Sequence, residues 1–248
     1  MRKIILHIPH SSTIIPIIDG YILNKKLINE EIIKLTDWHT EDLFYSQTEV
    51  SIIAPFSRIF CDVERFSDDE KEEMSKFGMG VLYETFDNGN ILRNVTPKLR
   101  KNILTNYYWK HHTEMNKAVS ESLKKENECL IVDCHSFPNT PLNRTLNKRE
   151  NRPDFNIGTD SFHTPPKLLV ECEKYFENLG YSIGIDWPYS GSIVPMDYYQ
   201  KDKRVSSIML EVNRKLYLEE GTNKKSDKYG KTKDVVQSFL KWLKTLVT

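Results

Sequence analysis

The sequence predicts an α/β fold built on a largely parallel sheet. Short β-branched runs alternate with stretches in which apolar residues recur at helical spacing, and this alternation is typical of parallel sheets. The run Glu128–His135 (ECLIVDCH) is continuously apolar before its polar end, as in a strand buried on both faces. With 248 residues and no recognisable linker or internal repeat, the chain is expected to form a single domain over 1–248.

The other elements follow from the same patterns. Further strands are expected at Lys3–Pro9, Ser51–Val63 (one or two strands, interrupted near Pro55), Tyr181–Asp186 and Ser206–Val212. Amphipathic helices are expected over about Lys98–Lys125, Lys167–Asn178 and 235–247. Two long segments, Ser67–Asn90 and Asn139–Thr164, fit no regular period, and loops of this length are often lids or binding loops.

Composition excludes several classes of function. The 35 basic residues balance 35 acidic ones, which disfavours both a nucleic-acid binder and a polybasic membrane binder. No apolar run approaches the roughly 20 residues of a membrane span, and the N-terminus lacks the apolar stretch of a signal peptide. The four cysteines lack CxxC spacing and are expected to be buried thiols in a reducing compartment, so we expect a cytoplasmic protein.

Polar residues gather where the apolar runs end. These clusters contain His10-Ser11-Ser12, Asp62-Val63-Glu64-Arg65, Asp133-Cys134-His135-Ser136 and Glu211-Val212-Asn213-Arg214. A further short segment, Thr36–Thr40, contains Asp37 and His39. In open α/β sheets, ligands bind beyond the carboxyl ends of the strands, so these side chains are expected to converge at one edge of the sheet.

Imidazole and carboxylate groups together suit a catalytic Zn²⁺ site. His10 and His135 are the best-placed imidazoles, and either Asp37 or His39 could supply the third ligand. Glu211 could then take a proton from the attacking water. An arginine could hold a substrate carboxylate in a bidentate fork, the candidates being Arg58, Arg65 and Arg214.

Structural interpretations compete with this hypothesis. A lone histidine after a strand is more often a satisfied core or surface residue than a metal ligand. Asp62 and Arg65 could form an ion pair of purely structural value. His111 and His112 are expected to pack against, or to support, the site from their helix, and the role of His7 stays open.

Eight segments, taken in order, resemble the N-formylglutamate amidohydrolase (N-formylglutamate deformylase) family. The segments cover nearly the whole chain and read HIPHSS (7–12), TDWHTEDLF (36–44), FSRIFCDVER (56–65), YYWKHHTEM (107–115), LIVDCHSF (130–137), RPDFNIGT (152–159), WPYSGSIVP (187–195) and IMLEVNRKLYL (208–218). The resemblance implies a three-layer fold similar to the zinc-dependent exopeptidases, with a mixed, mostly parallel sheet of eight strands between helices. It also implies zinc on His10 and His135 and a general base at Glu211.

The match to the exopeptidase ligand set is incomplete. Those enzymes carry a glutamate ligand three residues after the first histidine, where this chain has Thr13. We therefore expect Asp37 to complete the shell, with His39 as its rival.

The reaction that the resemblance implies is hydrolysis of a small anionic amide, with N-formyl-L-glutamate giving formate and L-glutamate as in histidine breakdown. Glu211 is predicted as the base and Arg65 as a donor to the developing oxyanion. Substrate contacts are predicted for Arg58, Arg214, His39 and Ser136. The alternatives are a metal-dependent amidase or peptidase acting on another N-acyl amino acid, or a carboxylate-binding relative without activity.

Departures from the family pattern concern the substrate more than the reaction. The family typically shows Asp-x-Asn-Arg where this chain has Asp62-Val63-Glu64-Arg65, and a glycine pair where it has Ser190-Gly191-Ser192. A histidine-bearing segment of the family reads Asp197-Tyr198-Tyr199 here. Specificity for another N-acyl amino acid is therefore kept open.

Overall fold

The structure, a computed structural model, describes residues 3–22 and 24–246 and is built around a mixed sheet. The strand order is β2-β1-β3-β6-β4-β5, with bounds Val50–Ile53, Ile4–Ile8, Cys129–Phe137, Val205–Asn213, Phe155–Gly158 and Ile183–Ile185. The first four run parallel, whereas β4 is antiparallel to β6 and parallel to β5. The prediction of a mostly parallel mixed sheet is confirmed.

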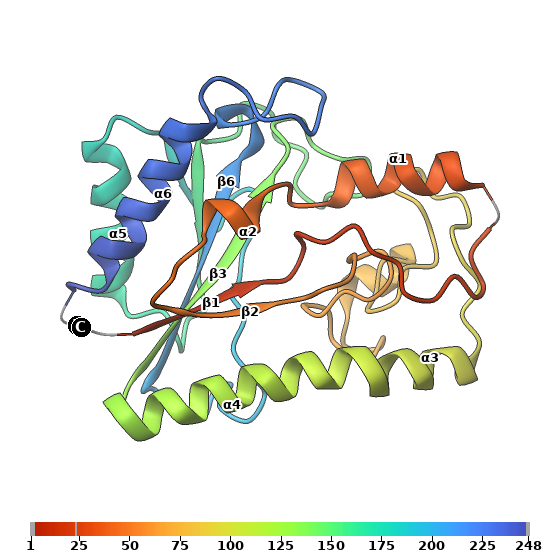
Figure 1. Ribbon diagram of the computed structural model, residues 1–248, viewed down its shortest axis with the longest axis horizontal. Helices are drawn as coiled ribbons and strands as arrows, with labels where there is room; N and C mark the ends of the chain where they lie inside the picture. Colours follow the sequence, from red (N-terminus) through yellow and green to blue (C-terminus); the bar gives the residue numbers. More distant parts are fainter. Residues whose placement is uncertain (1–2, 23, 247–248) are drawn as a thin grey trace.

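Helices cover both faces of this sheet, which gives three layers (Figure 1). The α-helices are α1 (Lys25–Leu35), α2 (Thr40–Leu43), α3 (Pro97–Ile103), α4 (Trp109–Glu126), α5 (Pro166–Asn178) and α6 (Tyr229–Leu243). Short 3-10 helices span Glu73–Phe77 and Arg214–Leu216, and a π-helical turn, Leu104–Tyr108, joins α3 to α4. Helices α5 and α6 lie on one face of the sheet, and the long α4 runs along the other.

Two apolar cores result from the alternation of side chains along the strands. On one face, Leu6, Val132 and Leu210 belong to the cluster that includes Phe176 of α5 and Phe239 of α6. On the opposite face, the odd-numbered apolar residues of β1 and β3 pack with Met115 and Val119 of α4. Because β3 is covered on both sides, all nine of its residues are buried, as its continuous apolar run predicts.

Strand register brings the polar residues together on the α4 face. His7 of β1 pairs with Asp133 of β3, and His135 pairs with Glu211 of β6. Residues two apart point to the same face of a strand, so these four side chains share one surface near the carboxyl ends of the central strands. The candidate site therefore forms on the α4 face of the sheet, near the carboxyl ends of its central strands.

Several predicted elements need correction. Among the described residues the sheet has six strands, not eight. The run Ser51–Val63 forms strand only as far as Ile53, because Pro55 has no N–H to donate and the chain turns away after Ala54 N bonds Ile8 O. Strand β4 forms inside Asn139–Thr164, which was expected to be irregular.

Other differences concern helices. Helix α1 was not predicted, although Ile28, Ile32 and Leu35 lie at helical spacing and pack in one apolar cluster. The C-terminal helix begins at Tyr229, earlier than expected, and Val247 lies outside the described residues. All four cysteines are free and buried, as predicted. Among the described residues, no helix is long and apolar enough to cross a membrane.

Candidate active site

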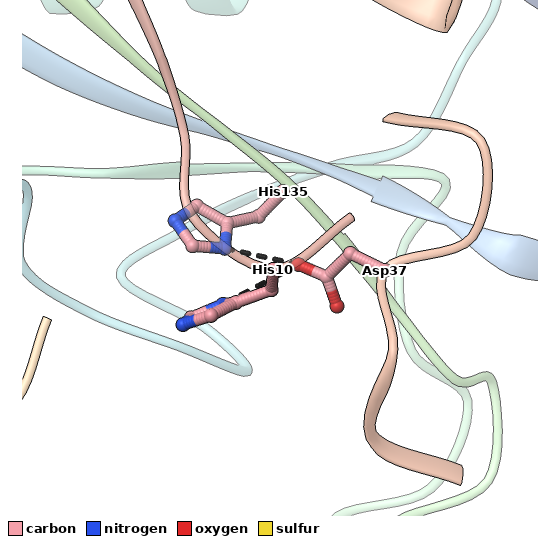
Figure 2. A group of neighbouring side chains, drawn as sticks. All are labelled: His10, Asp37 and His135. Carbon is pink, nitrogen blue, oxygen red and sulfur yellow. Dashed lines mark hydrogen bonds and ion pairs between the residues drawn. The ribbon is translucent and has the colours of Figure 1, made fainter. Parts of the chain in front are cut away.

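Three side chains from separate segments meet at the carboxyl end of the central strands: His10, Asp37 and His135 (Figure 2). Asp37 Oδ2 lies 3.7 Å from Nδ1 of His10 and 3.1 Å from Nδ1 of His135. All three residues are buried. The structure thus brings together the residues that the sequence analysis predicted as metal ligands.

Local structure explains how Asp37 reaches this position. Helix α1 ends where the Thr36 N–H bonds the Ile32 carbonyl, and the next N–H, of Asp37, donates to the His10 carbonyl at 2.9 Å. Arg214 Nη2 donates to Asp37 Oδ1 at 3.0 Å, and the Ser136 N–H donates to Oδ2 at 3.3 Å. The carboxylate is therefore fixed from three sides, with Oδ2 turned toward the two imidazoles.

A buried carboxylate stands behind the first histidine. Asp62 Oδ1 lies 2.9 Å from Nε2 of His10, while its Oδ2 accepts hydrogen bonds from Arg58 at 2.9 and 3.1 Å and from the Tyr83 hydroxyl at 3.0 Å. Burial alone would raise the pKa of Asp62, but the Arg58 guanidinium and His10 hold it well below its usual value. Ionised Asp62 can only accept hydrogen bonds, so Nε2 of a neutral His10 must carry the proton that it donates to Asp62. The Nδ1 lone pair of His10 then faces Asp37.

The second histidine is held in the same way. Nε2 of His135 lies 3.1 Å from Asp133 Oδ1 and 3.0 Å from Glu64 Oε1. Burial disfavours the charged imidazole, yet the carboxylates of Glu64 and Asp133 outweigh this effect and raise the pKa of His135 well above its usual value. These carboxylates therefore stabilise a positive charge, either on the His135 ring itself or on a cation beside it.

The donor set fits a divalent cation. Nδ1 of His10 is buried without a hydrogen-bond partner among the described residues, and it faces a carboxylate oxygen across a short gap. Two donors that bind one tetrahedral ion at about 2.0–2.1 Å lie roughly 3.4 Å apart, and the observed spacings of Asp37 Oδ2 to the histidines fall on either side of that value. Even without Glu211, carboxylates outnumber arginines around the group, so a divalent ion would offset excess negative charge (Asp37, Asp62, Glu64 and Asp133 against Arg58, Arg65 and Arg214).

Glu211 is a buried carboxyl group beside this donor set. It lies opposite His135 in the strand register, and its Oε2 has no hydrogen-bond partner among the described residues. Burial raises its pKa to about 8, with Asp37 and Glu64 adding to the effect and His135 opposing it. An unpaired buried carboxyl group is costly to keep, which favours a functional role.

A cavity of about 800 Å³ opens next to the cluster. Its wall includes Arg58, Glu64, Arg65 and Asp133, together with the loop residues Ser190–Ser192. His10, Asp37, His135 and Glu211 do not line it, and Glu64 and Asp133 lie between the cavity and Nε2 of His135. Two of the departures from the family pattern, at Glu64 and at Ser190–Ser192, therefore line this cavity.

The structure separates other predicted site residues by their contacts. His39 does not join the cluster: it begins α2 with a positive φ of 62°, and its Nε2 bonds the Asn223 carbonyl. Arg214 and Ser136 hold Asp37. Arg58 is engaged by Asp62, whereas Arg65 lines the cavity with its Nε 3.7 Å from Asp62 Oδ2. Their predicted contacts with substrate stay predictions.

Sequence reasoning missed what Asp62, Glu64 and Asp133 do. All three stand at the ends of apolar runs, but which imidazole atom each one contacts depends on tertiary structure. For Asp133 a signal existed, because it stands two residues before His135 in a strand and so shares its face. No comparable signal connects Asp62 or Glu64 to a particular histidine.

Comparison with known families identifies the group to which the chain is related. Residues 2–218 match the model of the N-formylglutamate amidohydrolase family. The chain belongs to this family. The resemblance seen in eight short segments is thus confirmed by a match over most of the sequence, and no match was found among curated proteins.

Solved structures support the fold. N-formylglutamate amidohydrolase from Ralstonia eutropha JMP134 superimposes with a TM-score of 0.83 at 20% identity, covering 98% of this chain and 94% of that one. The gene product Atu2144 from Agrobacterium tumefaciens gives a TM-score of 0.65 at 16% identity, covering 97% and 88%. The predicted zinc-exopeptidase-like fold is confirmed, and the protein is an amidohydrolase by family.

Proposed function

We propose that this amidohydrolase is metal-dependent and hydrolyses N-formyl-L-glutamate to formate and L-glutamate. The observation that supports metal dependence best is the buried, unpartnered Nδ1 of His10, which faces the carboxylate of Asp37. His10, Asp37 and His135 would hold the ion, with Zn²⁺ as the expected metal. The family match supports the substrate.

The chain's own residues supply the remaining chemistry. A divalent cation in the donor set would polarise the substrate carbonyl and lower the pKa of the attacking water. Glu211 accepts the proton of that water and passes it to the departing amine nitrogen, which could not leave as an anion. Water thus supplies the hydroxyl group of formate, and its proton completes the amino group of glutamate.

Charged groups of the cavity wall would bind the two substrate carboxylates. Arg65 is the best candidate because its side chain is partly exposed and its contacts with Asp62 and Glu72 are long, at 3.7 and 3.6 Å. Arg58 is less available, since two of its N–H groups already bond Asp62. A donor to the developing oxyanion is proposed from the same pair, as predicted from the sequence.

A second candidate substrate class is favoured by the size of the cavity. Its volume of about 800 Å³ lies within the range that holds drug-sized ligands, and N-formylglutamate is smaller than these. A larger N-acyl amino acid is therefore the alternative.

The proposed reaction is tested by mixing zinc-loaded protein with N-formyl-L-glutamate and measuring formate. We expect stoichiometric release of formate and L-glutamate. A panel of N-formyl, N-acetyl and dipeptide substrates, compared by kcat/KM, separates the two substrate classes. Zinc binding without turnover of any of them would point instead to a carboxylate-binding protein.

Replacing Arg65 by Met is expected to raise KM for N-formyl-L-glutamate by roughly tenfold or more, because a charge-assisted bond to a substrate carboxylate is lost. The KM for an N-formyl amino acid with an uncharged side chain should change less. Lys71→Met serves as the matched control, since Lys71 also borders the cavity but its side chain is 72% exposed. An equal rise in KM in both variants would argue against the role of Arg65.

We also propose a single domain over 1–248 and a cytoplasmic location. Helix α6 lies beyond the family match, yet the ring centroid of its Phe239 lies 4.8 Å from that of Phe176 on α5, which supports one shared core. The composition supports the location.

A further inference from the structure

A series of buried hydrogen bonds runs from helix α4 along the face of the sheet that α4 covers, and it ends at the candidate metal ligand His135. Nε2 of His111 on α4 lies 2.8 Å from Nε2 of His7 on β1, and Nδ1 of His7 lies 2.7 Å from Asp133 Oδ1. The same oxygen of Asp133 lies 3.1 Å from Nε2 of His135. His7 is fully buried and His111 is 4% exposed, so water does not compete for these bonds.

When the three imidazoles are neutral, only one placement of their ring protons satisfies all of these hydrogen bonds. Asp133 is ionised and only accepts, so His7 donates from Nδ1 and His135 donates from Nε2. The remaining nitrogen of His7 then accepts, and His111 must donate to it from Nε2. Burial lowers the pKa of His111 to about 2, in keeping with a neutral ring. As a result, the Nδ1 lone pair of His135 is left facing Asp37.

We propose that His111 and His7 are positioning residues for the metal centre, acting through Asp133 to fix the ring orientation and the tautomer of His135. The inference rests on the proposed metal site. Hydrogen bonds behind a histidine ligand commonly change metal affinity by roughly 10–100-fold, because they fix the ring and raise its basicity. Here the support reaches two residues further, from Asp133 to a helix on the sheet face that carries the site.

Asp62 supports the other histidine differently. It is held by Arg58 and Tyr83, which are a cation and a hydroxyl donor. Asp133 receives no arginine or lysine within 4.0 Å among the described residues, and its other oxygen accepts the Ile193 N–H. The orientation of Asp133 therefore depends strongly on His7.

A second cation held by His7, Glu64 and Asp133 is the competing interpretation of this cluster. The geometry argues against it. His7 Nδ1 and Asp133 Oδ1 are 2.7 Å apart, shorter than the roughly 3.4 Å expected between two ligands of one tetrahedral ion, and typical of a direct hydrogen bond.

The experiment compares two substitutions at His111. His111→Leu removes the donor, whereas His111→Gln keeps an N–H near the position of Nε2. Zinc affinity is measured by competition with a chelator, and the absorption spectrum of the Co²⁺ form reports ligand geometry. We expect His111→Leu to weaken zinc binding by about tenfold or more and to alter the cobalt spectrum, and His111→Gln to restore both.

His163→Gln is the control for general loss of stability. His163 is also a buried histidine, but it bonds Val205 O and Gln200 N. The His163→Gln variant should have a lower Tm than wild type and the same zinc affinity. The inference is overturned if His111→Leu binds zinc as tightly as wild type, or loses no more affinity than His163→Gln does. A stoichiometry of two ions per wild-type chain also overturns it.

Wild-type protein provides a test that needs no variant. In the ¹H–¹⁵N spectrum of the zinc-loaded protein, we expect protected imidazole protons on Nδ1 of His7 and on Nε2 of His111 and His135. A proton on Nε2 of His7 overturns the inference. Wild-type protein that binds no zinc refutes the proposed function and the inference with it, whereas tight zinc binding with unaffected variants refutes the inference alone.

Discussion

Glu211→Gln is expected to lower kcat for formate release by roughly a thousandfold while the protein stays folded. General acid–base catalysis typically contributes about 10²–10⁴-fold, and an amide side chain can neither accept the proton of the water nor deliver it to the amine. The carboxyl group is buried beside the donor set, and its Oε2 has no hydrogen-bond partner among the described residues. The measurement is kcat with N-formyl-L-glutamate at saturating zinc.

The substitution should not lower Tm. Burial raises the pKa of Glu211 to about 8, which means that the ionised form is costly to keep inside the fold, and glutamine removes that cost. Glu31→Gln is the matched control, because Glu31 is another buried carboxyl group whose pKa burial raises, but it bonds the Asp87 N–H away from the donor set. Normal turnover by the Glu211→Gln variant would exclude Glu211 as the general base.

Removing the metal is expected to abolish activity. Chelation followed by dialysis should lower kcat/KM by at least roughly a thousandfold, because polarisation of the carbonyl by an ion is worth several kcal/mol and each 1.4 kcal/mol is a factor of ten. Adding one equivalent of zinc should restore the rate, and elemental analysis should find one ion per chain. Full activity of the metal-free protein would contradict the proposed mechanism.

Asp37→Asn tests the assignment of the third metal ligand. The variant should bind zinc much more weakly than wild type, since a neutral amide is a poor substitute for a carboxylate ligand. Asp42→Asn provides the control, because Asp42 is a carboxylate five positions away that bonds Lys233 and Tyr229. It should respond to chelation and zinc as wild type does. If His39 were the third ligand instead, Asp37→Asn would retain tight binding and His39→Asn would lose it.

The prediction of the fold was correct for elements whose burial is visible as a pattern of apolar residues in the sequence. Strand β3 is covered by helices on both faces, so its residues had to be apolar throughout and the strand was visible. Strand β4 has four residues, and its formation depends on pairing with the edge of β6, which no local pattern reports. Helix α1 does carry a helical signal, with Ile28, Ile32 and Leu35 at i, i+4 and i+7, which the prediction did not include.

The sequence by itself determined the fold class and the family, and it indicated His10 and His135 as candidate metal ligands. It could do so because strands display their burial as apolar runs, and because His10 and His135 stand at the ends of such runs. It also left Asp37 and His39 as rivals for one position. Their order along the chain cannot separate two residues that lie two positions apart in a turn.

Only the tertiary structure decided which of them faces the histidines and what stands behind each ring. Asp37 is tied to the His10 carbonyl and to Arg214, whereas the positive φ at His39 turns its ring toward Asn223. The contacts of Asp62, Glu64 and Asp133 with the imidazole nitrogens join segments far apart in the chain. The physical reason is that hydrogen-bond geometry depends on distances of a few tenths of an ångström, which packing sets and residue type does not.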